Sequence, residues 1–225
     1  MNKLFSSKSK KNSSTISAKI RPALDLNRCI AKDIFESRLR PWDAIPSIKT
    51  FIIEHGHELP YDEYDEIAEN VWIHITAYLA PSAKIEGPAI ICGGARIGHF
   101  STLQSSIIGS FTSIGELTTI KSSILFDKSK LCGHNHLCSS ILGYESAVGI
   151  GSMIPDTRLD NMNVTVDMPD GIYISGRQHL GAVICDGVKI GASCIINPGS
   201  VIDVGSQIYP STSVSGYVYP YSTVK

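Results

Sequence analysis

The segment LCGHNHLCSSILG, residues 131–143, places two cysteines and two histidines close together. Cys132, His134, His136 and Cys138 lie within seven residues, and thiolate and imidazole are the ligands that zinc prefers. A histidine could instead act as a general base, because imidazole titrates near neutral pH. A third possibility is that these residues fill positions in a pattern set by a longer repeat.

A repeat with a fine period of six residues runs through the chain from Trp72 onward. The motifs SSIIGS, SSILFD and SSILGY recur 17 residues apart, because two six-residue steps are followed by one five-residue step. The large aliphatic positions are Ile73, Leu79, Ile85, Ile91, Ile97, Leu103, Ile108, Ile114, Ile120, Leu125, Leu131, Leu137, Leu142, Val148 and Ile154, and the pattern returns at Ile184, Ile190, Ile196, Ile202, Ile208 and Val214.

A second column of small residues lies four positions after the aliphatic ones, as at Ala95, Ser101, Thr118 and Ser152. Neither a helical period of 3.6 nor a strand period of 2 explains this spacing. A triangular coil does, because each hexapeptide supplies one flat face and one tight corner, with the aliphatic side chain pointing inward. The sequence therefore predicts an all-β fold, a single-stranded parallel β-helix of about seven coils over residues 71–225.

This repeat argues against a zinc site in residues 131–143. Cys132 and Cys138 each follow an inward leucine, so they occupy equivalent places on two adjacent faces. A six-residue face is roughly 18 Å long, which puts equivalent points roughly 10–18 Å apart and directed away from each other. Two thiolates at about 2.3 Å from one zinc ion cannot be so placed. We expect no metal in this chain.

Three segments lie outside the repeat. Residues 1–21 carry six Lys/Arg and no acid, which is typical of a disordered tail, although a basic arm for nucleic acid is an alternative. Residues 22–70 predict a helical cap, with Ile45, Ile48 and Ile52 at helical spacing and Gly56 as a stop. Residues 155–183 interrupt the repeat with NVTVDMPDGIYIS, a hairpin signal. This insertion is either a loop thrown off one corner or an arm that reaches a neighbouring subunit or covers substrate.

Composition narrows the class of protein. The chain has 225 residues, 43% hydrophobic and 18% charged, with a formal net charge of −1. This balance favours neither nucleic acid nor a membrane as a partner, and no apolar run approaches the roughly 20 residues of a membrane span. We find no secretory signal and expect six free cysteines in a reducing cytoplasm.

Residues 41–225 resemble the hexapeptide-repeat, left-handed β-helix acyltransferases. The segments that carry the resemblance are NVWIHITAYLAPSAKIEGPAIICGGARIGHF, IKSSILFD, SSILGY and the preceding PWDAIPSIKTFII. They look most like the acetyltransferase domain of the bifunctional enzyme that makes UDP-N-acetylglucosamine. The resemblance implies a left-handed coil, acetyl-CoA as co-substrate, acetylation of a glucosamine-1-phosphate-like sugar, and a homotrimer with active sites between neighbouring β-helices. No Gly-rich nucleotide loop is visible, so no pyrophosphorylase activity is expected.

Residues 131–143 match the family's motif around the catalytic histidine only in part. Anchored on SILG, the family histidine falls on Gly133, with His134 one residue away. Asn135 matches the family asparagine, and His136 replaces a tyrosine. The resemblance therefore implies that His134 or His136 is the base and that Asn135 orients the substrate.

Other site positions of the family are also changed or kept. A sugar-phosphate arginine falls near Gln104, a basic residue is kept as Lys121, and a family asparagine becomes Asp156. We therefore predict substrate binding by Lys121 and Gln104. His74 and His99 are expected at the surface, whereas His179, after the insertion, is a candidate for lining a cleft between subunits.

Three functions remain open at this point. The first is acetyl-CoA-dependent N-acetylation of an amino sugar phosphate or a nucleotide-linked amino sugar in cell-envelope precursor synthesis. The second is a trimeric scaffold or regulatory protein that keeps ligand binding but has lost catalysis, as Gly133 suggests. The third is a metal-dependent β-helix enzyme, which would need three histidines to converge between subunits.

Overall fold

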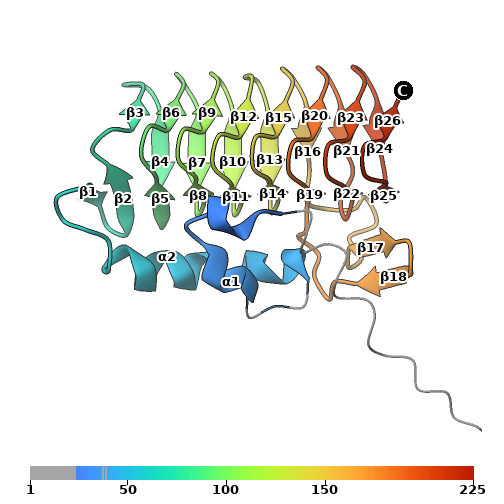
Figure 1. Ribbon diagram of the computed structural model, residues 1–225, viewed down its shortest axis with the longest axis horizontal. Coiled ribbons are helices and arrows are strands. Elements are labelled where there is room, and N and C mark those ends of the chain that lie inside the picture. Colours follow the sequence, from blue (N-terminus) through green and yellow to red (C-terminus); the bar gives the residue numbers. More distant parts are fainter. Residues whose placement is uncertain (1–23, 37, 39) are drawn as a thin grey trace, which may run out of the picture.

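The aliphatic and small columns of the sequence form the inside of a coil. The computed structural model describes residues 24–36, 38 and 40–225, so the predicted tail over residues 1–21 lies outside the described residues. One continuous core of fully buried side chains runs through the coil, and Ile97, Leu131 and Leu142 are among its members. Figure 1 shows the coils stacked side by side, with the C-terminus at the end of the stack.

Three parallel sheets form the flat faces, which we call face A, face B and face C. Face A contains β2(Val71–His74), β5(Ala89–Ile91), β8(Ile107–Ile108), β11(Ile124–Leu125), β14(Ile141–Leu142), β19(Val183–Ile184), β22(Val201–Ile202) and β25(Tyr217–Val218), with β1(Tyr64–Ala68) antiparallel at its edge. Face B contains β3(Tyr78–Leu79), β6(Arg96–Ile97), β9(Ser113–Ile114), β12(Lys130–Leu131), β15(Ala147–Val148), β20(Lys189–Ile190), β23(Gln207–Ile208) and β26(Thr223–Val224). Face C contains β4(Lys84–Glu86), β7(Thr102–Gln104), β10(Thr119–Lys121), β13(His136–Cys138), β16(Met153–Ile154), β21(Ile195–Ile196) and β24(Ser213–Val214).

The strand registers reproduce the predicted columns. Ile108 pairs with Leu125, and Leu125 pairs with Leu142, each 17 residues further along the chain. The described part of the chain thus completes seven coils, and β25 and β26 add two faces of another. The predicted all-β, left-handed parallel β-helix is confirmed.

The corners show why the repeat needs small polar residues. Thr112, Ser146 and Ser152 are fully buried, and their hydroxyls donate to backbone carbonyls of the next coil. Phe100 and Leu117 take φ of 57° and 55°, in the left-handed region that a tight corner requires. Hydroxyl groups therefore supply hydrogen-bond donors to backbone oxygens at the corners inside the coil.

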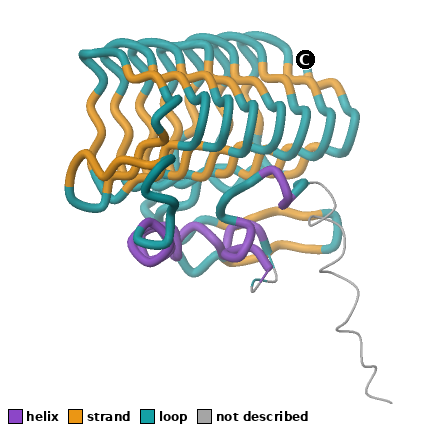
Figure 2. The backbone as a smooth tube through the Cα atoms, turned by 60° about the vertical axis from the view of Figure 1, so that its left-hand side comes forward, coloured by secondary structure: helices purple, strands orange, loops and turns teal. Residues whose placement is uncertain are grey.

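The predicted helical segment is present, but it covers a face and not an end of the coil. It comprises short 3-10 helices Leu26–Arg28 and Pro41–Ser47, α1(Lys32–Glu36) and α2(Ile48–Gly56). Pro46 has no N–H to donate, and the α-helix begins only beyond it. Figures 1 and 2 show the helices running along face A.

A second hydrophobic core joins this segment to the outer side of face A. Trp42, Ile48 and Ile52 of the helical segment pack with Ile107 and Ile124 of face A. Face A is consequently apolar on both sides, which accounts for runs such as AIIC that do not alternate.

The insertion forms the predicted hairpin, β17(Thr165–Met168) and β18(Gly171–Ile174). It folds back over the chain's own face A, where Val164 and Val166 join the second core. Arg177 donates to the Trp42 carbonyl at 3.2 Å, so the hairpin and the helical segment support each other. In the described part of the chain, no helix is long and apolar enough to cross a membrane.

Candidate functional site

The outer surface of face C gathers three of the five predicted site residues. Side chains alternate along a strand, so Lys121 and Gln104 point outward while the neighbouring Ile120 and Leu103 are buried inside the coil. Lys121 is in register with Gln104 on one side and with Cys138 on the other. His136 begins the same strand as Cys138, so it shares this outer surface.

His134 and Asn135 lie apart from that surface, at the corner between faces B and C. His134 is exposed, has a φ of 52°, and donates its backbone N–H to the Glu116 carbonyl at 2.8 Å. Its corner position is equivalent to those of Phe100 and Leu117 in the two preceding coils. The imidazole is therefore presented to solvent beside face C.

Asn135 points into the coil. Only 3% of it is exposed, and its amide oxygen accepts from the Gly133 N–H at 3.0 Å. Its amide nitrogen donates to the carbonyls of Gly149 at 2.7 Å and Ser152 at 3.3 Å. These bonds take the place of the hydrogen bonds that serine and threonine hydroxyls make at other corners. The presence of an amide here is therefore explained by the structure of the coil, without a role in substrate binding.

His136 is engaged with a neighbouring thiol. Its Nε2 lies 3.1 Å from the Cys138 Sγ, and Cys138 is 5% exposed. Burial, and to a lesser extent the nearby Asp156 carboxylate, raises the pKa of the Cys138 thiol to about 11 against the opposing effect of Lys121. The thiol is therefore neutral at pH 7, and a neutral thiol can donate its S–H to the imidazole nitrogen.

Asp156 and His179, which the sequence named separately but did not pair, complete this edge of face C. Asp156 Oδ2 accepts from the Ser139 hydroxyl at 2.7 Å and lies 3.3 Å from His179 Nδ1. The 17-residue period indicates the position of Asp156, because Asp156 continues the corner column of Ser105, Ser122 and Ser139. Nothing in the period could locate His179, since the insertion separates it from Asp156 along the chain.

The remaining histidines and cysteines are placed elsewhere. His99 is exposed, as expected, whereas His74 is half-buried, with Nδ1 bonded to Thr76 and Nε2 at 3.8 Å from Glu63. Cys132 is exposed on face B and Cys138 is buried on face C. Across the described residues, no three His, Cys, Asp or Glu side chains come together in a way that could hold a metal ion.

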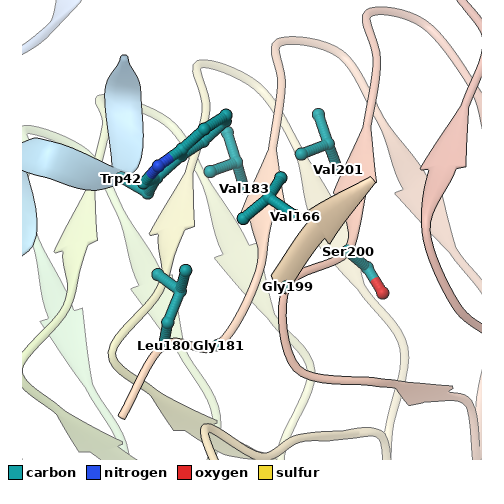
Figure 3. A pocket seen from close by; sticks show the side chains of 8 residues that line it. All are labelled: Trp42, Val166, Leu180, Gly181, Val183, Gly199, Ser200 and Val201. Atoms are coloured by element: carbon teal, nitrogen blue, oxygen red, sulfur yellow. The ribbon is translucent and has the colours of Figure 1, made fainter. Parts of the chain in front are cut away.

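Figure 3 shows a narrow gap between the helical segment, the hairpin and face A. Trp42, Val166, Leu180 and Val201 are among the side chains that line it, and the gap is too narrow to hold a water molecule. Its lining comes from face A, the hairpin side and the helical segment and includes neither a histidine nor Lys121, so we do not assign it to substrate.

No family model matches the chain. An uncharacterized acetyltransferase YaiX of Escherichia coli is 28% identical over 151 residues, 67% of this chain and 66% of that protein. A bifunctional sugar-1-phosphate nucleotidylyltransferase/acetyltransferase of Sulfurisphaera tokodaii is 30% identical over 102 residues, 45% of this chain and 25% of that protein. The bifunctional protein GlmU of Methanococcus vannielii is 28% identical over 187 residues, 75% of this chain and 41% of that protein.

Solved structures of acyltransferases also show similarity. One is the N-acyltransferase AntD from Bacillus cereus in complex with dTDP and coenzyme A, with 17% identity, 71% of this chain and 83% of that chain covered, and a TM-score of 0.39. Another is the acetyltransferase domain of PglB from Neisseria gonorrhoeae with acetyl coenzyme A, with 19% identity, 57% and 52% covered, and a TM-score of 0.32. The fold assignment rests on the strand registers and not on these two structures.

The chain spans slightly less than two thirds of YaiX and well under half of the bifunctional enzymes. The curated relatives carry the name acetyltransferase or GlmU, and this chain is built on six-residue repeats, three to a coil. The chain is thus similar in sequence to proteins named as acetyltransferases, and its own fold is a parallel coil of six-residue repeats.

Proposed function

We propose that this protein transfers an acetyl group from acetyl-CoA to the amino group of a sugar that carries a phosphate or a nucleotide, as glucosamine-1-phosphate does. The observation that carries the proposal is the outer surface of face C, where Lys121 and Gln104 are in register on neighbouring coils and His136 lies on the next coil, in the strand whose Cys138 is in register with Lys121. Among known proteins, the acetyltransferases and bifunctional sugar-phosphate enzymes named above support this substrate class.

The chemistry needs a base, an anchor for phosphate and a path for the leaving thiol. The amine nitrogen attacks the thioester carbonyl carbon, the C–S bond breaks, and a base takes the ammonium proton while coenzyme A leaves as a thiol. Lys121 supplies a cation and Gln104 an amide for phosphate oxygens. His134 and His136 are the bases that the sequence puts forward, and both border face C.

A homotrimer with the reaction between neighbouring copies belongs to the same proposal. An exposed apolar strip crosses the B–C corner and continues onto face C, next to His134 and His136. It consists of Phe100, Leu117, Ile150, Met153 and Ile195. A strip of this kind is typical of a surface that another chain covers. A cytoplasmic location and a role in cell-envelope precursor synthesis remain predictions.

The test is release of free coenzyme A thiol from acetyl-CoA with a panel of amino sugars. The panel contains glucosamine-1-phosphate, glucosamine and a nucleotide-linked amino sugar, with N-acetylglucosamine-1-phosphate as the blocked control. We expect thiol release with the phosphorylated or nucleotide-linked amines only. Absence of turnover with every amino sugar would contradict the proposal.

The alternative, a scaffold that binds ligand without catalysis, is favoured by two observations. Gly133 stands at the position of the family histidine, and the Asn135 amide is fully engaged with backbone groups. Under this alternative, acetyl-CoA would raise the melting temperature, since a ligand that binds the native state stabilises it. No thiol would then be released with any amine on the panel.

A further inference from the structure

We propose that His179, oriented by Asp156, is the general base of the acyl transfer; this inference rests on the proposed function and names the residue that takes the amine proton. Neither residue is among the bases predicted from the sequence. The pair lies where face C meets face A, at the same edge as Lys121 and Cys138.

The contacts at Asp156 fix which imidazole nitrogen is free to react. A carboxylate only accepts hydrogen bonds, so the His179 nitrogen that faces it, Nδ1, carries the proton. The lone pair of the neutral ring is then on Nε2. The His179 side chain is 69% exposed and that of Asp156 is 18% exposed, so the reactive nitrogen faces the surface while the orienting carboxylate is half-enclosed. A carboxylate, an imidazole and a free Nε2 are the arrangement that general-base catalysis requires.

The backbone holds this pair on a rigid corner and not on a free loop. The Leu180 N–H donates to the Asp156 carbonyl at 2.8 Å, and the Gly181 N–H donates to the Ser139 carbonyl at 2.9 Å. A Cβ at Gly181 would lie 2.1 Å from the Cys138 carbonyl oxygen, so only glycine permits so close an approach. The two ends of the insertion are therefore clamped together, which keeps His179 next to Asp156 although 23 positions separate them.

Other histidines of the described chain fit the role less well. His136 has its Nε2 against the Cys138 thiol, which occupies the lone pair that a base would use. In the part of the chain that the structure describes, no side-chain carboxylate lies against His134 to orient it. His74 has both nitrogens engaged, one by Thr76 and the other near Glu63.

The surroundings of the pair also match the substrate class. Lys121 is in register with Cys138, and the next residue, Ser139, donates its hydroxyl to Asp156, so a cation and the base's orienting carboxylate lie at the same end of neighbouring strands. A sugar whose phosphate contacts Lys121 could thus direct its amine toward His179. Nε2 takes the ammonium proton as the amine attacks the thioester, the Asp156 carboxylate stabilises the imidazolium, and the departing thiolate of coenzyme A recovers that proton.

The experiment measures kcat, KM and the pH profile of acetyl transfer to the amino sugar that turns over fastest. The variants are His179→Gln, His136→Gln, His134→Gln and Asp156→Asn, with His55→Gln on the helical segment as the matched control. We expect His179→Gln to lower kcat by roughly 10²–10⁴ with little change in the KM for acetyl-CoA. The acidic limb of the wild-type kcat/KM profile should disappear in this variant. Because the His179 side chain is mostly exposed, the melting temperature should stay within about 1 °C of wild type.

Asp156 is a positioning residue, and its variant has its own signature. Removing the carboxylate destabilises the imidazolium, so Asp156→Asn should move the acidic limb to lower pH as well as reduce kcat. His179→Ala should recover part of its activity when imidazole is added, because the free base can occupy the vacated space. A merely structural role would produce neither the shift nor the rescue.

The outcomes separate the two proposals. If wild type turns over and His179→Gln keeps the wild-type kcat and acidic limb, while His136→Gln or His134→Gln loses them, His179 is not the base and the acyltransferase proposal stands. If wild type releases no thiol with any amino sugar, both proposals are overturned.

Discussion

At the scale of single residues, the coil explains why chemically competent side chains in residues 131–143 do such different things. Asn135 is turned inward to a corner, His134 outward at the same corner, and His136 outward on face C. One step along a strand reverses the direction of a side chain, so neighbours in the sequence are not neighbours in a site. Replacing each of these residues should therefore have a different measurable effect.

Replacing Asn135 should mainly cost stability. Asn135→Ala removes three hydrogen bonds and takes away the side-chain partner of the Gly133 N–H and of the Gly149 carbonyl inside the coil, whereas the Ser152 carbonyl keeps the His136 N–H. We expect the free energy of unfolding to fall by about 2–4 kcal/mol. Asn135→Ser should cost less, because serine and threonine serve at equivalent corners such as Ser101 and Thr118. Urea unfolding checks both variants, and equal stability of Asn135→Ala and wild type would refute the structural role.

Cys132 and Cys138 should differ sharply in their reactivity toward thiol reagents. Cys132 is exposed, whereas the Cys138 thiol has a pKa of about 11 and is buried. At pH 8 roughly one Cys138 in a thousand is a thiolate, and the thiolate is the reactive form. We therefore expect a disulfide reagent to show one fast phase per native chain, which Cys132→Ser abolishes. A fast phase that survives in Cys132→Ser but disappears in Cys138→Ser would mean that His136 draws the proton from Cys138.

At the scale of elements, the helical segment and the hairpin share one task, which is to cover the outer side of face A. The coil itself was predictable, because a six-residue period leaves few alternatives and the inward position of each strand in the coil is occupied by an aliphatic side chain. The helix was predictable from Ile45, Ile48 and Ile52, and the hairpin from MPDG. Their position was not, because a pattern within one segment does not state which distant face it covers.

This arrangement predicts a contrast between two isoleucines. Ile124 is fully buried between face A and the helical segment, whereas Ile174 is 72% exposed on the hairpin. Ile124→Ala should lower the free energy of unfolding by about 3 kcal/mol, because it leaves a cavity in a packed core. Ile174→Ala should change it by less than about 0.5 kcal/mol. Similar losses for the two variants in urea unfolding would contradict the packing of the helical segment on face A.

The candidate site was only partly predictable for a related reason. The 17-residue period placed Gln104 and Lys121 in register, since the period itself defines stacked positions. It also gave the corner column that ends in Asp156. The contact of Asp156 with His179 depends on how the insertion returns to the coil, which no periodicity describes. The contact between the Cys138 thiol and His136 likewise depends on the geometry of the strand.

At the scale of the whole molecule, the exposed apolar strip of Phe100, Leu117, Ile150, Met153 and Ile195 predicts association of several copies. Light scattering during size-exclusion chromatography should give the mass of a trimer. Met153→Glu, in the middle of face C, should shift the mass toward that of a monomer, because it places a charge in the apolar contact. Ile174→Glu on the hairpin is the matched control and should leave the mass unchanged. A wild-type protein that elutes as a monomer would contradict the trimer.

The claim that face C is the site of acyl transfer is tested most directly by two lysines on different faces. Lys121 lies on β10 of face C and Lys130 on β12 of face B, and both are exposed. With glucosamine-1-phosphate as acceptor, Lys121→Gln should lower kcat/KM by roughly 10- to 100-fold, because one charge-assisted hydrogen bond to phosphate is lost. Lys130→Gln should stay within about twofold of wild type. If both variants keep the wild-type kcat/KM, or if only Lys130→Gln loses it, face C is not where the acetyl group is transferred.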